Sequence, residues 1–76
     1  MPKLRKVSGS ETVKILCNKF GFIIDGRTGS HVRLSKIIDT GKVATVVPLH
    51  DEVKIGTFKS ILKLANVNEE EFSEFL

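Results

Sequence analysis

With 76 residues, the chain has room for one small domain over residues 1–76, and a deep enclosed substrate cavity is not expected, because chains of this size bury only about 60% of their unfolded surface. Hydrophobic residues make up 41% and charged residues 28%, which argues against disorder, and no apolar run approaches the roughly 20 residues that span a bilayer. The formal charge is +3, no apolar signal region follows Met1–Lys6, and Cys17 is the only cysteine, so we expect a cytoplasmic protein without disulfides.

The first predicted element is a helix over about residues 9 to 20. Ser8 and Glu11 have the spacing of a capping box, in which the serine hydroxyl accepts from the amide of Glu11 and the carboxylate returns to the amide of the cap. Gly21 follows at the position where a left-handed residue ends a helix. Ile15 lies off the apolar stripe of this helix. The stripe, at i, i+3, i+4 and i+7, consists of Val13, Leu16, Cys17 and Phe20.

A short β-prone run, residues 22–24, is predicted as the first strand. Asp25-Gly26 follows it directly and is a dipeptide typical of tight turns, so we expect the strand to end there. Residues 27–30 then continue the connection to the second strand.

The second strand starts at His31 and shows the alternation of a half-buried strand. Val32 and Leu34 share an apolar face, whereas His31 and Arg33 share the opposite face. The third strand, residues 43–48, ends at a proline, which cannot donate to a sheet ladder and so suits a strand end. Its own alternation is weak and leaves open which of its faces is buried.

A polar, Gly-containing break between these two strands is typical of a β-hairpin. If Thr40 and Gly41 are the two loop residues, the register sets His31 opposite His50, with Cβ atoms roughly 4.5–5.5 Å apart. A three-residue loop would set Leu49 opposite His31 instead. With the shorter loop, the hairpin brings together the only two histidines of the chain.

Two helices are predicted in the last third of the chain. Thr57 can cap the first of them, and Asn66 suits its left-handed end. Asn68, with Glu71 three residues on, opens a short last helix. The longer helix again has one apolar stripe, formed by Phe58, Ile61, Leu62 and Ala65.

These elements predict an α+β fold with the order α-β-β-β-α, a three-stranded antiparallel sheet and a short C-terminal helix. Both main helices would cover one face of the sheet and leave the other open to solvent. Residues 1–38 carry a net charge of +6 and residues 39–76 a net charge of −3. An open face on a basic half favours a polyanion, RNA above all, although scattered Lys and Arg can equally serve only to solvate the fold.

The candidates for chemistry reduce to the two histidines, because the sequence has no Gly-rich phosphate loop and no paired-cysteine metal spacing. A histidine near neutral pH can remove the 2′-hydroxyl proton of RNA or protonate the leaving 5′-oxygen. RNA supplies its own nucleophile, so no cofactor is expected, provided that a cation such as Arg33 or Lys36 holds the phosphate. The alternative is that His31 is a polar surface residue and that His50 only bonds a loop carbonyl.

A metal site is the less favoured use of these residues. His31, His50, Asp51 and Glu52 have suitable ligand atoms, but their spacing matches no local zinc motif, so no metal is expected. Cys17 stands alone in a helical pattern and is expected to be a small buried apolar residue.

Six segments, in their order and spacing, resemble the HicA family of toxins over nearly the whole chain. They are Ser8–Glu11, Phe20–Phe22, Gly29–His31, Val47–His50, Ile55–Phe58 and Ile61–Lys63. The resemblance implies a fold like that of double-stranded-RNA-binding domains and the activity of an mRNA interferase, an endoribonuclease that needs no metal. It also implies a protein partner, a HicB antitoxin that binds the toxin and masks its active site.

The catalytic histidine of the family lies in its Gly-Ser-His segment, which implies that His31 is the acid or base that cleaves messenger RNA here. Ser30 and His50 are the auxiliary candidates. The basic side chains expected to guide the RNA are Arg27, Arg33, Lys36, Lys3, Arg5 and Lys6.

An alternative from another class is a non-catalytic RNA-binding module of the same fold. Such a module reads phosphates with a lysine cluster at the start of its last main helix, and Ile55–Lys59 lacks this cluster. Together with the Gly-Ser-His match, this favours the enzyme. A third interpretation, a purely structural partner of a HicB-like protein, would require that His31 is dispensable.

Overall fold

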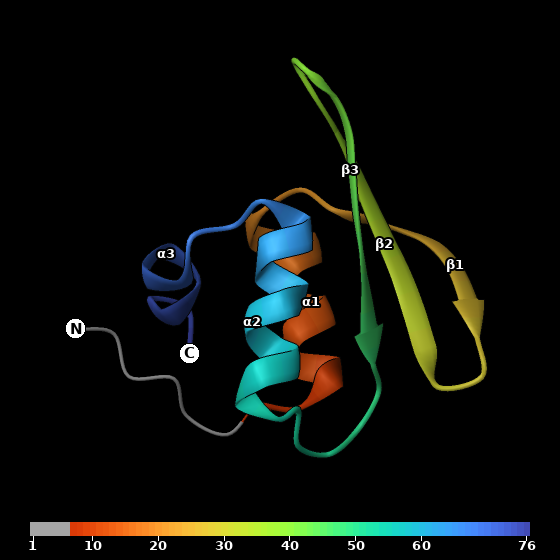
Figure 1. Cartoon of the computed structure of the whole chain (residues 1–76), viewed down its shortest axis with the longest axis vertical. Coiled ribbons are helices and arrows are strands. Elements are labelled where there is room, and N and C mark those ends of the chain that lie inside the picture. The colour runs from red at the N-terminus through yellow and green to blue at the C-terminus, as the bar shows by residue number, and fades with distance from the viewer. Residues whose placement is uncertain (1–6) are drawn as a thin grey trace.

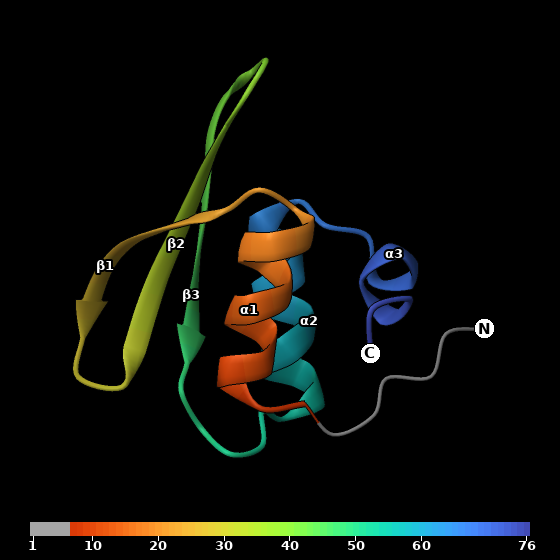
Figure 2. The same ribbon diagram turned by 180° about the vertical axis from the view of Figure 1, so that it is seen from behind.

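The computed structural model describes residues 7–76, which form an α+β fold with the predicted order of elements. The strands pair antiparallel in the order β1-β2-β3, and the two longer helices lie next to each other on one side of the sheet (Figure 1), as the view from behind also shows (Figure 2). The predicted fold class and meander are therefore confirmed. The elements are α1 (Gly9–Lys19), β1 (Ile23–Thr28), β2 (His31–Ile38), β3 (Gly41–Pro48), α2 (Ile55–Ala65) and α3 (Glu69–Ser73).

Local signals set both ends of α1. The Ser8 hydroxyl accepts from the backbone N–H of Glu11 at 3.0 Å, as a capping serine does, and Gly21 takes a left-handed φ of +76° just after the helix. The predicted buried face was too narrow, since Ile15 is buried although it was placed off the stripe. Ile15 belongs to the core cluster and borders a small hollow together with Lys19 and Phe75, so the C-terminal segment adds a second buried side to α1. Cys17 is half-buried against the core, and this burial raises the pKa of its thiol.

The start of α2 differs from the prediction. The helix begins at Ile55 rather than after Thr57, and Lys54 stands at the N-cap without a side-chain hydrogen bond to the helix. The first turn closes because the Phe58 N–H donates to the Lys54 carbonyl at 2.8 Å. The predicted end is confirmed, because Asn66 adopts a left-handed φ of +58°. The predicted apolar stripe is buried in full, at Phe58, Ile61, Leu62 and Ala65.

The core lies between the sheet and the two longer helices. Val32 and Leu34 of β2 face the helices as predicted, and on β3 Thr45 and Val47 are buried, with Pro48 also buried at the strand end. The Thr45 hydroxyl is satisfied because it donates to the Ile61 carbonyl at 2.9 Å. None of the helices in residues 7–76 combines the length and the apolar character that a membrane crossing requires.

The last helix, α3, closes the core on the side of the helix pair away from the sheet (Figure 1). Its Phe72 is fully buried, with its ring stacked at 6.1 Å on Phe20 and edge-on at 5.1 Å to Phe58. The predicted cap is confirmed, since the Asn68 side chain accepts from the backbone N–H of Glu70 and of Glu71.

The Asp25-Gly26 dipeptide is a β-bulge and not the predicted turn. Ile24 pairs with Leu34 and Gly26 pairs with Arg33, so Asp25 is the extra residue and β1 continues to Thr28. The turn into β2 is Gly29-Ser30 instead, with Gly29 at a φ of +59°. This is the two-residue loop in which glycine comes first. The prediction failed because Asp-Gly suits a bulge as well as a turn.

The hairpin register also differs from both predicted registers. The loop between β2 and β3 is Asp39-Thr40, with Ile38 paired to Gly41, and His31 is therefore opposite Pro48 and not opposite His50 or Leu49. A loop of Thr40 and Gly41 would favour positive φ at both positions, which a β-branched threonine resists. Here the positive φ, +136°, falls on Gly41, just after the loop.

Candidate active site

His31 is exposed at the start of β2, on the sheet face that the helices leave open. Its neighbours in the sheet are Thr28 of β1 and Pro48 of β3. The ladder continues past the end of β3, because the Leu49 N–H donates to the Ser30 carbonyl at 2.7 Å. The backbone that carries His31 is thus fixed on both sides, while its ring stays accessible.

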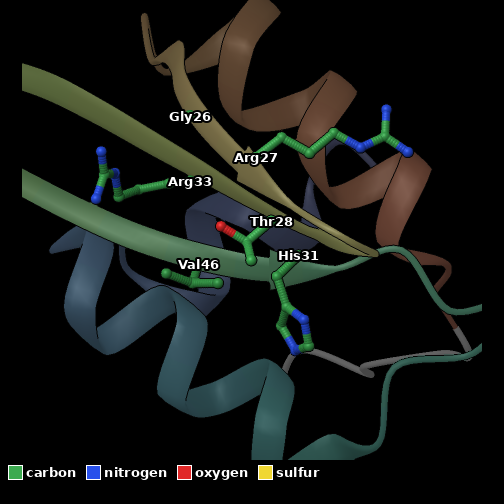
Figure 3. A pocket seen from close by; sticks show the side chains of 6 residues that line it. All are labelled: Gly26, Arg27, Thr28, His31, Arg33 and Val46. Carbon is green, nitrogen blue, oxygen red and sulfur yellow. The ribbon is translucent and has the colours of Figure 1, made fainter.

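One hollow, of about 360 Å³, opens on the bare face of the sheet. Figure 3 shows His31 and Arg33 at its two ends, with Thr28 and Val46 between them. Because Gly26 has no side chain, that part of the floor is backbone. The full lining is Gly26, Arg27, Thr28, His31, Arg33 and Val46.

Of the two cations that line this hollow, Arg33 is on the strand of His31, two residues away and on the same face of β2. Its Nε lies 3.8 Å from Asp25 Oδ2, and Lys42 donates to the same oxygen at 3.2 Å. The hydrogen bond from Lys42 and the charges of Lys42 and Arg33 hold the pKa of Asp25 below its ordinary value. Asp25 is therefore a carboxylate at neutral pH.

A second hollow, of about 370 Å³, lies on the other side of His31, between the end of β3 and the start of α2. His50 lines it as well, so the two histidines share a surface although the predicted strand pairing was wrong. The loop that carries His50 is anchored by the Gly9 N–H, which donates to the His50 carbonyl at 2.9 Å. The lining is His31, Pro48, His50, Glu52, Val53, Lys54 and Thr57.

Arg27 and Lys36, two of the predicted RNA-binding cations, are less directly placed for the site than Arg33. Arg27 lines the His31 hollow at its edge, but it pairs with the inward-facing Val32, and its Nε donates to the Gly29 carbonyl at 3.1 Å. Lys36 is five residues along β2, roughly 16 Å from His31 at strand spacing, and its ammonium lies 5.8 Å from the centre of the Phe22 ring. Arg33 is therefore the cation on the same strand and face as His31, and Arg27 lies at the edge of the same hollow.

The remaining predicted cations, Lys3, Arg5 and Lys6, lie outside the described residues. Sequence reasoning missed Asp25 and Gly26 as parts of the site, together with Lys54 and Thr57 at the second hollow. A glycine inside a strand pattern is itself a signal for a bulge, which could have identified Asp25-Gly26. Among residues 7–76, no group of three or more His, Cys, Asp or Glu side chains has an arrangement suited to a metal ion.

Comparison with known proteins identifies a family whose model covers this site. The family model described as the HicA toxin of bacterial toxin-antitoxin systems matches residues 9–67, which is more than half of the chain and includes His31 and His50. The search of curated proteins gave no match, and neither did the search of solved structures.

Proposed function

Because this chain belongs to the HicA toxin family of bacterial toxin-antitoxin systems, we propose that it is an endoribonuclease that cleaves messenger RNA in the cytosol with His31 as its catalytic residue. One observation carries the proposal. The His31 ring is exposed in a hollow on the open sheet face, with the Arg33 guanidinium at the other end of that hollow. An acid-base group and a phosphate-binding group are thus within one small surface.

The proposed reaction needs only proton transfers and charge stabilisation. The 2′-oxygen of the RNA attacks the adjacent phosphorus, the bond to the 5′-oxygen breaks, and a 2′,3′-cyclic phosphate and a 5′-hydroxyl result. His31 either removes the 2′-hydroxyl proton or protonates the departing 5′-oxygen. Water or His50, on the second hollow, serves for the other transfer, and Ser30 is an auxiliary donor at the turn.

Arg33 is proposed to hold the reacting phosphate. A guanidinium offers a planar fork of donors that matches two phosphate oxygens, and it keeps its charge at any relevant pH. As negative charge builds on the phosphorus oxygens, a fixed cation stabilises the transition state more than the ground state. A strand of RNA can lie along the open sheet face, so no deep pocket is needed.

The partner proposed for this toxin is a HicB-like antitoxin. Family membership implies a toxin-antitoxin pair, and an antitoxin that covers the open sheet face would block RNA from His31 and Arg33 together. The proposal is tested by incubating the purified chain with RNA in the presence and absence of the antitoxin. Cleavage that the antitoxin suppresses supports it, and a chain that binds RNA without cutting it would instead be a binding module.

We expect His50→Ala to lower the cleavage rate by about tenfold or less, against about 10²–10⁴-fold for removal of a positioned acid-base group. His50 is exposed after the end of β3, and its loop is held through its backbone, so the variant should keep its fold. Single-turnover cleavage of a labelled RNA measures the effect. A loss equal to or larger than that of His31→Ala would show that the roles are shared or reversed.

A further inference from the structure

The bulge in β1 directs a carboxylate onto the open face of the sheet. Asp25 is the residue that the ladder skips, between the pairs Ile24 to Leu34 and Gly26 to Arg33. Bulges commonly redirect a side chain in this way. The Asp25 carboxylate meets Lys42 at 3.2 Å and Arg33 at 3.8 Å, so it bridges cations from the two other strands.

Gly26, the next residue, leaves room for the Arg33 side chain because it has no side chain of its own. Gly26 is the partner of Arg33 in the ladder, and a Cβ added at Gly26 would lie 3.2 Å from the Nη2 of Arg33. The guanidinium therefore lies over bare backbone. The ion pair with Asp25 is made through Nε, so the donors on the two terminal nitrogens remain for another ligand.

We propose that Asp25 is a positioning residue, which holds the Arg33 guanidinium at the rim of the His31 hollow in the orientation that binds an RNA phosphate. This inference rests on the proposed function, in which RNA lies on the open face. A free arginine side chain must give up its rotational freedom when it binds, and a side chain that is already held gives up less. Asp25 thus acts through Arg33 and does not touch the RNA.

If the Asp25 carboxylate is removed, a pure charge effect and a positioning effect predict changes of opposite sign in the affinity for RNA. If Asp25 were only one negative charge near the RNA, its removal would strengthen binding of a polyanion. If it positions Arg33, its removal weakens binding in spite of the more positive surface. The sign of the change therefore separates the two roles.

The test compares Asp25→Asn with Asp39→Asn, which changes the net charge by the same amount. Asp39 is exposed in the loop between β2 and β3 and lines neither hollow. The probe is a short 2′-O-methyl RNA oligonucleotide, which lacks the 2′-hydroxyl nucleophile and so is not consumed. We expect Asp25→Asn to bind it about threefold more weakly than wild type, in line with one exposed ion pair, and Asp39→Asn to bind it as tightly or more tightly.

A double variant tests whether Asp25 works through Arg33. Asp25→Asn combined with Arg33→Gln should bind no more weakly than Arg33→Gln alone, because the side chain to be positioned is gone. In cleavage assays Asp25→Asn should lower kcat/KM, and this loss should be absent in the Arg33→Gln background. Melting curves of the variants by circular dichroism should match that of wild type, since the Asp25 side chain is on the surface.

The outcomes are distinguishable. If the wild-type chain cleaves RNA while Asp25→Asn and Asp39→Asn bind the oligonucleotide equally well, or if the effects of the double variant add, the positioning role is overturned and the ribonuclease assignment stands. If the folded wild-type chain neither binds nor cleaves RNA, both are overturned.

Discussion

His31→Ala is expected to lower RNA cleavage by about 10²–10⁴-fold, the range for loss of a positioned acid-base group, and to abolish growth inhibition on expression in bacteria. Its side chain is exposed at the start of β2, so truncation removes no core contact and the melting temperature should be unchanged. Cleavage of an end-labelled RNA under single-turnover conditions, beside a thermal melt of the same preparation, measures both quantities.

The matched control for this variant is Ile37→Ala. Ile37 lies on the same face of β2 and is 77% exposed, but it lines neither hollow. The Ile37→Ala protein should cleave RNA at the wild-type rate. This result would separate the loss of the imidazole from a general disturbance of the sheet face. A His31→Ala protein that cleaves as fast as this control would refute the catalytic assignment.

Gly9→Ala is expected to destabilise the fold by about 2–3 kcal/mol, toward the upper end for overpacking, and to lower the melting temperature by about 10 °C or more. A Cβ at Gly9 would overlap the Pro48 carbonyl oxygen and lie 2.8 Å from the Leu49 Cα. Backbone atoms cannot yield as a flexible side chain can. The start of α1 would be pushed from the end of β3, and the hydrogen bond from the Gly9 N–H to the His50 carbonyl would be lost.

Gly56→Ala is the control for this second prediction. Gly56 is in the first turn of α2, has no atom near the position of an added Cβ, and does not have a positive φ. Alanine there should stabilise the fold by about 0.4–1 kcal/mol, because it restricts the unfolded chain. Chemical denaturation of both variants measures the difference. Equal stabilities for Gly9→Ala and Gly56→Ala would contradict the close packing of α1 on the end of β3.

The features that sequence predicted well are those that neighbouring residues determine. Ser8 caps α1, Asn66 ends α2, and the stripe that includes Phe58 is buried, because each depends on groups within about one helical turn. The inward Val32 and the outward His31 follow from strand alternation alone. These local signals were enough to predict the order of the elements and the presence of an open sheet face.

The features that failed depend on how strands meet. β1 continues past its predicted end through one extra residue, Asp25, and this shift sets Arg27 in register with the inward-facing Val32. A one-residue shift of the loop from Thr40-Gly41 to Asp39-Thr40 moves His31 from opposite His50 to opposite Pro48. The two histidines still line one hollow, but through the loop after β3, whose course no local pattern predicts.

The most direct test of the central claim, that His31 cleaves RNA through the RNA's own 2′-hydroxyl, is to identify the ends of the products made by wild-type protein in excess EDTA. The account predicts that RNA is cut at the rate seen without chelator and that the fragments carry 2′,3′-cyclic phosphates and 5′-hydroxyls. A matching oligonucleotide with 2′-O-methyl groups should stay intact. Cleavage that stops on chelation, or fragments with 5′-phosphates and 3′-hydroxyls, would contradict the account.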